Sequence, residues 1–230
     1  MKMYMITILS AMLLISCGIK VEKKETLTEI TKEEIKKETK AMETGKDVKD
    51  VKDKSFDELF KSIKPEDITD NIFKLVGQDF TVITAGKEPD HNSMTASFGG
   101  VGILFEKPVT WCFLRASRYT LELIRKEHTY TMSYFPDRYK EQVLFFGSKS
   151  GRDTDKMKEN TLTAVKTPSG NVTYKEARLI IECKLTELTT VSPDDFYTQQ
   201  GKEFITGAYD EVHDYHKLVF GEITNVWVEL

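Results

Sequence analysis

Runs of strand length dominate the C-terminal part of this chain. They are rich in β-branched and aromatic residues, and Gly, Pro, Asn or Asp bounds each of them. The runs cover residues 79–84, 108–114, 128–134, 177–185 and 217–223. Helical patterns intervene at 119–126 and 139–146, so regular βαβ repeats are few. This distribution predicts a mainly β protein, a closed antiparallel barrel with peripheral helices, rather than a doubly wound parallel sheet.

Two helices are expected ahead of the first strand. Ser55 and Glu58 have the spacing of a capping box, which predicts a short helix starting there. Pro65 is expected to open a second helix that runs to about Leu75 and closes near Gly77.

The first residues of the chain resemble a bacterial lipoprotein signal. Lys2 gives a positive start, residues 6–15 are apolar, and Cys17 follows Leu-Ile-Ser. The apolar stretch is shorter than the roughly 20 residues that a membrane-spanning helix needs. We therefore expect residues 1–16 to be a signal peptide and Cys17 to be lipidated. An ordinary start with a short apolar stretch is the alternative.

Charged residues of both signs fill most of the stretch that follows, which lacks aromatic residues. This composition predicts that residues 17–54 form a charged, disordered tether. Residues 55–230 are of a normal size for one domain. The net charge of −4 and the lack of a basic patch interleaved with aromatics argue against nucleic acid as a partner. Together these features predict an exported, membrane-anchored lipoprotein whose globular domain lies outside the cytoplasm.

Three clusters of hydroxyls, small residues and cations lie between the predicted strands, at residues 92–97, 115–120 and 148–153. Arginine can bind a pair of anionic oxygens, and hydroxyls and backbone N–H groups can complete a phosphate shell. Residues 115–120 lie where a strand ends and a helix begins, and a helix N-terminus suits a phosphate. Taken alone, each cluster could instead be an ordinary helix cap or barrel strand.

The order and spacing of these clusters resemble the flavin reductase-like (flavoredoxin-type) FMN-binding split-barrel family, from about Ile72 to Val228. The resemblance implies a Greek-key split barrel, FMN as cofactor, and homodimers with FMN at the interface. In the family, the motif at 115–120 grips the FMN phosphate. Related proteins often carry Trp where this chain has Phe98. Phe98 lacks the indole N–H donor that Trp would place near the flavin ring.

The resemblance also implies a set of site residues. Arg152 or Lys156 would place a positive charge near the reduced ring, which favours acceptance of hydride. The residues expected to bind FMN are Asn92, Met94, Thr95, Ala96, Ser97, Arg115, Ser117, Arg118, Tyr119, Thr120, Ser148, Ser150, Gly151, Arg152, Asp153 and Lys156.

His216 matches a family position near the flavin and is the candidate for a ring contact or proton donor; a satisfied surface histidine is the alternative. His213 and His216 would point to opposite faces of a strand, so we expect no metal site. The glycines of residues 99–102 lack the third glycine and following helix of a dinucleotide fingerprint. Any nicotinamide must therefore bind transiently over the flavin.

The predicted function is relay of hydride or electrons by FMN to an extracytoplasmic acceptor, as in flavin reductases or flavoredoxins. The alternative is a non-enzymatic barrel that binds flavin or haem. The sequence identifies neither the electron donor nor the acceptor. Cys112 and Cys183 lie in apolar runs, where buried thiols are expected, although a disulfide between them is also compatible with export.

Overall fold

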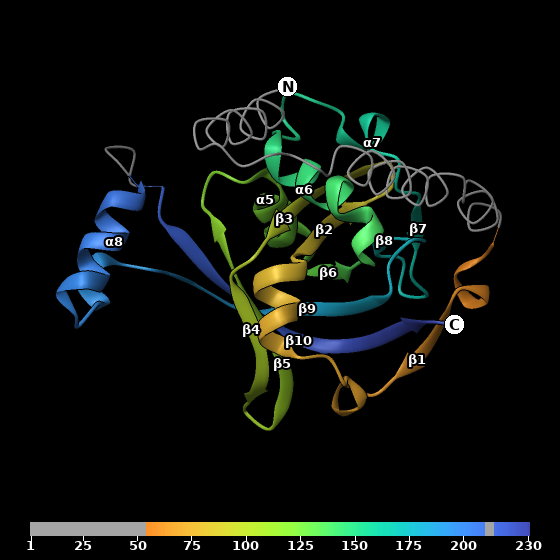
Figure 1. Ribbon diagram of the computed structural model, residues 1–230, viewed down its shortest axis with the longest axis horizontal. Helices are drawn as coiled ribbons and strands as arrows, with labels where there is room; N and C mark the ends of the chain where they lie inside the picture. Colours follow the sequence, from red (N-terminus) through yellow and green to blue (C-terminus); the bar gives the residue numbers. More distant parts are fainter. Residues whose placement is uncertain (1–53, 210–213) are drawn as a thin grey trace, which may run out of the picture. The chain divides into compact units, whose positions relative to one another are not determined.

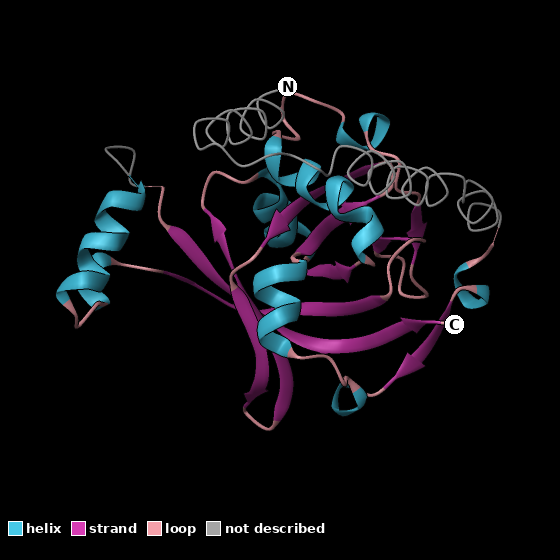
Figure 2. Cartoon of the chain, viewed as in Figure 1, coloured by secondary structure: helices cyan, strands magenta, loops and turns pink. Residues whose placement is uncertain are grey.

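The structure is a computed structural model that describes residues 54–209 and 214–230. The predicted signal peptide, Cys17, His213 and all of the predicted tether except Lys54 lie outside the described residues. Strands form the centre of the described part, and helices lie at its periphery (Figures 1 and 2). The prediction of a mainly β protein with peripheral helices is confirmed.

One eight-stranded antiparallel sheet organises the domain, in the order β3-β2-β6-β9-β10-β5-β4, with β1 paired to β10 beside this path. Its strands are β1 (Phe60–Ile63), β2 (Thr81–Lys87), β3 (Asp90–Ala96), β4 (Gly99–Leu104), β5 (Lys107–Arg115), β6 (Thr129–Tyr134), β9 (Leu179–Thr190) and β10 (His216–Glu229). The short strands β7 (Ala164–Lys166) and β8 (Val172–Tyr174) form a separate hairpin. The ladder starts at β3 and ends at β4, so these two strands are its edges.

Helix α5 carries the chain from one part of the sheet to another. β5 lies beside β4 and β10, whereas β6, the next strand along the chain, lies between β2 and β9. Such a long connection among antiparallel strands is typical of Greek-key folds. The turn that precedes α5 lies at the end of β5, where the chain leaves the β4–β5–β10 part of the sheet.

Two of the longer helices cover the sheet with their apolar faces. The helices longer than two turns are α5 (Tyr119–Glu127), α6 (Lys140–Ser148) and α8 (Gln199–Tyr209). α5 buries Leu121 and Ile124 and packs on β2 and β3, and α6 buries Val143 and Phe146 and packs mainly on β3. Both predicted helices are therefore confirmed, and they hold β3 from two sides.

Two hydrophobic cores form because successive residues of a strand point to opposite faces of the sheet. On β2, Ile83 packs in the core that includes Leu121 of α5. Its neighbour Val82 packs in the second core, with Phe146 of α6 and Tyr174 of β8. This double burial explains why β2 does not alternate between apolar and charged residues in the sequence.

The chain ahead of β2 departs from the prediction. The capping box at Ser55 and Glu58 is present, but it opens only the single 3₁₀ turn η1 (Phe56–Glu58), and β1 follows directly. The predicted continuous helix from Pro65 to Leu75 is wrong. It is a 3₁₀ turn, η2 (Pro65–Asp67), and then a new start at α4 (Ile72–Lys74), which continues as the π-helix η3 (Leu75–Asp79).

Polar side chains cause this break. The Asn71 side chain accepts hydrogen bonds from the N–H groups of Phe73 (3.0 Å) and Lys74 (3.2 Å), which makes it an N-cap. Asp70 is drawn into an ion pair with Arg178 at the start of β9, 2.8 Å away. The Asp and Asn side chains thus stabilise an interruption that the helical periodicity did not show.

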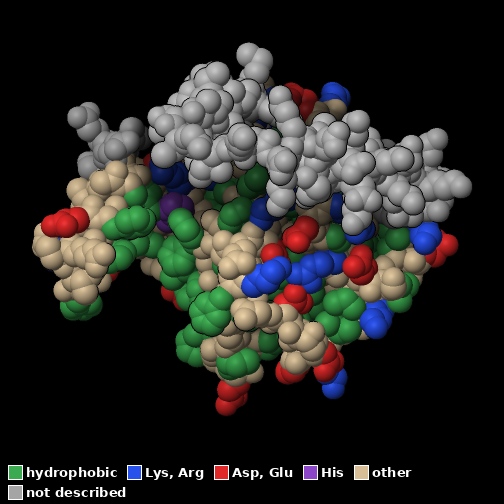
Figure 3. Space-filling view, viewed as in Figure 1, with side chains coloured by type: hydrophobic (Ala, Val, Ile, Leu, Met, Phe, Trp, Pro, Cys, Tyr) green, Lys and Arg blue, Asp and Glu red, His purple; other side chains and the backbone are tan. Residues whose placement is uncertain are grey.

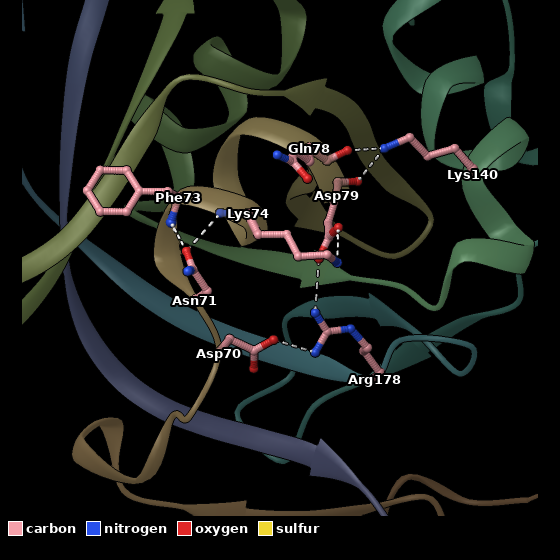
Figure 4. Close-up of polar contacts among 8 residues, drawn as sticks. All are labelled: Asp70, Asn71, Phe73, Lys74, Gln78, Asp79, Lys140 and Arg178. Carbon is pink, nitrogen blue, oxygen red and sulfur yellow. Dashed lines mark hydrogen bonds and ion pairs between the residues drawn. The ribbon is translucent and has the colours of Figure 1, made fainter.

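An ion-pair network, which we call the Arg178 cluster, fixes this segment to the sheet (Figure 4). The Arg178 guanidinium lies between the carboxylates of Asp70 and Asp79, with Asp79 at 3.2 Å. Lys74 pairs with the other oxygen of Asp79 at 2.7 Å, and Lys140 of α6 donates to the backbone carbonyl of Asp79 at 3.2 Å. Every cation of the cluster therefore has a partner.

Cys112 and Cys183 are both buried as free thiols. Cys183 Sγ lies 3.3 Å from the hydroxyl of Thr110, and burial raises its pKa to about 12. The two residues are thus protonated, apolar parts of the core. Within residues 54–209 and 214–230, no helix has the length and apolar character needed to cross a membrane.

Candidate functional site

The turn between β5 and α5 carries the first group of predicted site residues. β5 ends at Arg115 and α5 begins at Tyr119, as predicted. Arg118 is the N-cap residue of α5, and no side chain caps this helix end. Backbone N–H groups in the first turn of a helix lack intrahelical acceptors and lie at the positive end of the helix dipole. The turn therefore offers hydrogen-bond donors and positive potential to an anion.

A cavity of about 310 Å³ lies where this turn meets β3 and the loop after α6. Its lining residues are Asn92, Met94, Ser117, Arg118, Tyr119, Thr120, Lys149, Ser150, Gly151, Arg152 and Lys156. All except Lys149 belong to the set predicted to bind the cofactor. The volume lies at the lower end of the range of small-molecule pockets, ~300–1,000 Å³. We call this space the site cavity.

Close packing holds the three stretches of chain together. The Asn92 side-chain amide of β3 donates to Thr120 Oγ1 of α5 at 2.7 Å. The loop after α6 reaches β3 at Gly151, where a Cβ would clash with the Asn92 side chain. A larger residue at 151 would have to displace the Asn92 side chain, which is the common contact of all three stretches.

Lys156 gives the site cavity a buried positive charge. It is the first residue of the short helix α7 (Lys156–Glu159) and is only 5% exposed. Its Nζ donates to the backbone carbonyls of Ser93 (2.9 Å) and Phe146 (2.8 Å), and no carboxylate of the described residues pairs with it. Burial, and then the nearby charge of Arg118, lower the pKa of Lys156 to about 8.

The other cations of the cavity differ in whether they have a partner. Arg152 pairs with Glu122 of α5 and lies over the Tyr119 ring, 5.1 Å from its centroid. Lys149 pairs with Glu159. In contrast, the Arg118 side chain has no hydrogen-bond or ion-pair partner among residues 54–209 and 214–230. Arg118 and Lys156 therefore leave positive charge in the site cavity with which no carboxylate of the described residues pairs directly.

A second cavity of about 580 Å³ adjoins the first. The two share the lining residues Asn92, Tyr119, Gly151, Arg152 and Lys156. Asp153, another predicted site residue, lines only the second cavity. His91 lies in the same wall, and burial lowers its pKa; neither ring nitrogen has a partner in the described part of the chain.

Five of the residues predicted to bind FMN do not line either cavity: Thr95, Ala96, Ser97, Arg115 and Ser148. The Thr95 hydroxyl donates to the Val143 carbonyl of α6, and the Ser148 hydroxyl donates to Phe145 of the same helix at 2.8 Å. On β3, Asn92 and Met94 line the site cavity, and Ser97 lies beyond the end of the strand.

Arg115 and His216 lie together at the other side of the turn. They are register partners in β5 and β10. The Arg115 guanidinium donates to the Ala208 carbonyl of α8 at 3.2 Å and lies over the Tyr209 ring. His216 Nδ1 contacts the Tyr209 hydroxyl, and burial and then the charge of Arg115 lower the pKa of His216. The structure therefore separates these two residues from the cavity lining.

Sequence reasoning missed two residues at the site. Lys149 lies inside the cluster at residues 148–153, and its positive charge in the sequence could have indicated a place in the site. Asp214 accepts hydrogen bonds from the backbone N–H and the hydroxyl of Ser117. It is far from Ser117 in sequence, and only the pairing of β10 with β5 brings them together. Within the described residues, no group of three or more His, Cys, Asp or Glu side chains could hold a metal ion.

Comparisons with known proteins agree with this geometry. An FMN-binding protein from Thermus thermophilus, with p-hydroxybenzaldehyde bound, is 21% identical, with a TM-score of 0.52 over 74% of this chain and 82% of that one. An FMN-binding domain of a flavin reductases-like enzyme from Shewanella baltica is 14% identical, with a TM-score of 0.53 over 74% and 77%. Flavoredoxin of Desulfovibrio vulgaris is 20% identical, with a TM-score of 0.50 over 72% and 76%.

These likenesses show that the fold is that of FMN-binding split-barrel proteins. Comparison with curated proteins found no match. The model of the flavin reductase-like domain family matches residues 73–230, which include both cavities and every strand from β2 onward. The chain belongs to the flavin reductase-like domain family.

Proposed function

We propose that this chain binds FMN in the site cavity and uses it to relay hydride or electrons to an acceptor outside the cytoplasm. One observation carries the proposal: Arg118 and Lys156 bring unbalanced positive charge to the uncapped end of α5, in a chain of the flavin reductase-like family. Structurally similar proteins are described as FMN-binding or as flavoredoxin, which supports the same cofactor.

The residues present fit the phosphate of FMN. The Arg118 guanidinium and the Lys156 ammonium would supply charge-assisted hydrogen bonds. The Thr120 hydroxyl accepts from Asn92, so its own proton remains available for donation. Ser150 and the N–H groups of Tyr119 and Thr120 at the start of α5 add neutral donors. Such a set would hold a dianion far better than an uncharged hydroxyl group.

The remaining lining residues would contact the rest of the cofactor. Met94 and Tyr119 give apolar and aromatic surface, and the Asn92 side chain is fixed by Thr120. When bound, FMN would supply hydride or single-electron chemistry. The chain would orient it and keep cations nearby, and Arg152 near the ring would stabilise an anionic reduced form. His216 stays a candidate proton donor beside Arg115.

Identification of the cofactor tests this proposal. The purified chain should be yellow, and reverse-phase chromatography of the denatured protein should release FMN in about one equivalent per chain. A haem band would favour the alternative of a haem-binding barrel. A colourless protein that takes up no flavin on titration would refute FMN binding. A screen of reduced donors, followed by flavin absorbance, would then identify the electron source.

We also propose that the chain is a lipoprotein anchored outside the cytoplasm through Cys17. The apolar stretch at 6–15 followed by Leu-Ile-Ser-Cys supports this. Cys17→Ala should leave the protein uncleaved or release it from membranes. Unchanged mass and membrane fractionation in that variant would contradict the anchor.

Homodimer formation is the remaining part of the proposal. Hydrophobic side chains reach the surface over the β4–β5 hairpin (Figure 3). Phe98 is 57%, Ile103 71% and Phe105 86% exposed, on or beside the edge strand β4. An exposed apolar edge favours pairing with another chain. Light scattering should give twice the chain mass, and Ile103→Asp combined with Phe105→Asp should return a monomer.

A further inference from the structure

A carboxylate of the chain itself occupies part of the anion-binding turn. The two oxygens of Asp214 accept both donors of Ser117: the backbone N–H at 2.9 Å and the hydroxyl at 2.6 Å. Ser117 lines the site cavity immediately before the N-cap residue Arg118. An acidic side chain therefore takes up two donors at the point where the structure would otherwise offer most to an anion.

Asp214 belongs to the same electrostatic neighbourhood as the cations of the turn. It raises the pKa of His216, whereas Arg115 and Arg118 lower it, so all three charges act on one ring. Arg115 also donates to Ala208 of α8. Ala208 of α8 thus contacts Arg115, and Asp214, just ahead of β10, contacts Ser117.

We propose that Asp214 is a specificity-determining residue, which competes with the phosphate of a phosphorylated flavin for the two donors of Ser117. An N–H and an O–H each hold one proton, so they cannot bond fully to the Asp214 carboxylate and to a phosphate together. Phosphate binding must therefore displace the carboxylate, which weakens the affinity for FMN. Riboflavin lacks the phosphate and does not meet this competition. The inference rests on the proposed binding of FMN in the site cavity.

Titration of apoprotein with FMN and with riboflavin, followed by quenching of flavin fluorescence, tests the proposal. The variants are Asp214→Ala, which frees both donors, and the isosteric Asp214→Asn, which removes the charge but keeps an acceptor. Asp57→Asn is the matched control, because it removes one exposed negative charge from η1. Circular dichroism confirms that each variant folds.

FMN affinity should rise by about tenfold in Asp214→Ala, because a charge-assisted competitor of at least about 1.5 kcal/mol is removed. It should rise less in Asp214→Asn and stay unchanged in Asp57→Asn. Riboflavin affinity should stay the same throughout. Equal gains in Asp214→Ala and Asp214→Asn would overturn competition for donors, because charge repulsion alone would explain them.

Two other outcomes would also overturn the proposal, and they have different meanings. FMN affinity that is unchanged or lower in both Asp214 variants, while wild type binds FMN, would show that Asp214 only supports the turn. Absence of FMN binding in wild type and variants alike would refute the proposed function itself, and the role of Asp214 with it.

Discussion

Arginine and lysine side chains cluster in two regions of this protein. In one region the cations pair with carboxylates, and in the other two of them do not. In the Arg178 cluster, the guanidinium lies between two carboxylates, and Lys74 shares one of them (Figure 4). In the site cavity, Arg118 has no partner in the described residues, and Lys156 is buried against backbone carbonyls. The first region holds the fold together, whereas the second is arranged to receive an anion.

The difference is informative because an unbalanced buried charge costs free energy. The chain tolerates this cost at Lys156, where a lysine pKa of about 8 reports the penalty. Perturbed ionisable groups in cavities are candidates for function on this physical ground. The comparison therefore predicts that substitutions in the Arg178 cluster change stability, and that substitutions in the site cavity change binding.

The largest effect should come from Arg178→Ala. The side chain is 25% exposed, and its partner Asp79 is 8% exposed, so the substitution leaves a poorly solvated carboxylate without its arginine. Loss of the two charge-assisted contacts with Asp70 and Asp79, while Lys74 still pairs with Asp79, should cost about 3 kcal/mol in the free energy of unfolding. Urea unfolding measures it, with the exposed Arg125→Ala as control. The affinity of the variant for FMN should stay within about twofold of wild type. A loss of FMN binding without a loss of stability would contradict the distinction between the two regions.

Lys156 should make apoprotein stability depend on pH. Its folded pKa of about 8 lies below the ordinary lysine value of 10.5, so between these values the unfolded chain binds more protons. Stability must then rise with pH over that window, and the gain is on the order of 2–3 kcal/mol. Below about pH 8 the cost of the buried charge is fully present.

The check is unfolding of wild type and Lys156→Met from pH 7 to 10.5, with Lys158→Met of the same helix as control. Taking the difference between proteins cancels the titration of other groups. The free energy of unfolding of wild type should increase relative to that of Lys156→Met as the pH rises. A difference that is flat with pH would mean that Lys156 is well solvated in the folded protein.

Arg118→Ala should weaken FMN binding with little change in stability. A charge-assisted hydrogen bond contributes about 1.5–3 kcal/mol, so the loss should be on the order of tenfold to a hundredfold. Riboflavin has no phosphate for Arg118 to bind, so its affinity should stay constant. Fluorescence titration of both flavins, with Arg125→Ala as control, separates the roles. Equal losses for both flavins would place Arg118 at the ring or in the fold.

Arg152→Ala should have the smallest effect on FMN. Glu122 already balances this guanidinium, and both side chains of the pair are largely exposed, so solvent screens the charge. We expect a loss of less than about threefold. Glu122→Gln should free the guanidinium and tighten FMN slightly. A larger loss in Arg152→Ala than in Arg118→Ala would reverse the distinction between paired and unpaired cations within the site cavity.

Much of the fold could be predicted because it rests on local patterns. Runs rich in β-branched residues predicted the main strands, and the helical patterns between them predicted α5 and α6. The break at Asp70 and Asn71 could not be predicted, because it depends on an ion pair with Arg178, far along the chain. For the same reason β1 was missed: its pairing with β10 decides its conformation.

The site shows the same division. The β5–α5 turn and the loop containing Gly151 were recognisable from residue types, and most of the predicted residues do line one cavity. Arg115 and Arg118 look alike in sequence, yet only Arg118 lines the cavity, because α8 engages Arg115. The contact of Asp214 with Ser117 likewise depends on strand pairing. Long-range contacts thus decide which cations are free.

The most direct test of the account is the ratio of FMN to riboflavin affinity in the wild-type apoprotein. The two ligands share the ring, so the ratio isolates the phosphate and the cations that would receive it. With Arg118 and Lys156 both available, FMN should bind at least about a hundredfold more tightly, from two charge-assisted hydrogen bonds of roughly 1.5 kcal/mol or more each. Equal affinities for the two flavins would contradict the assignment of the site cavity to a phosphate.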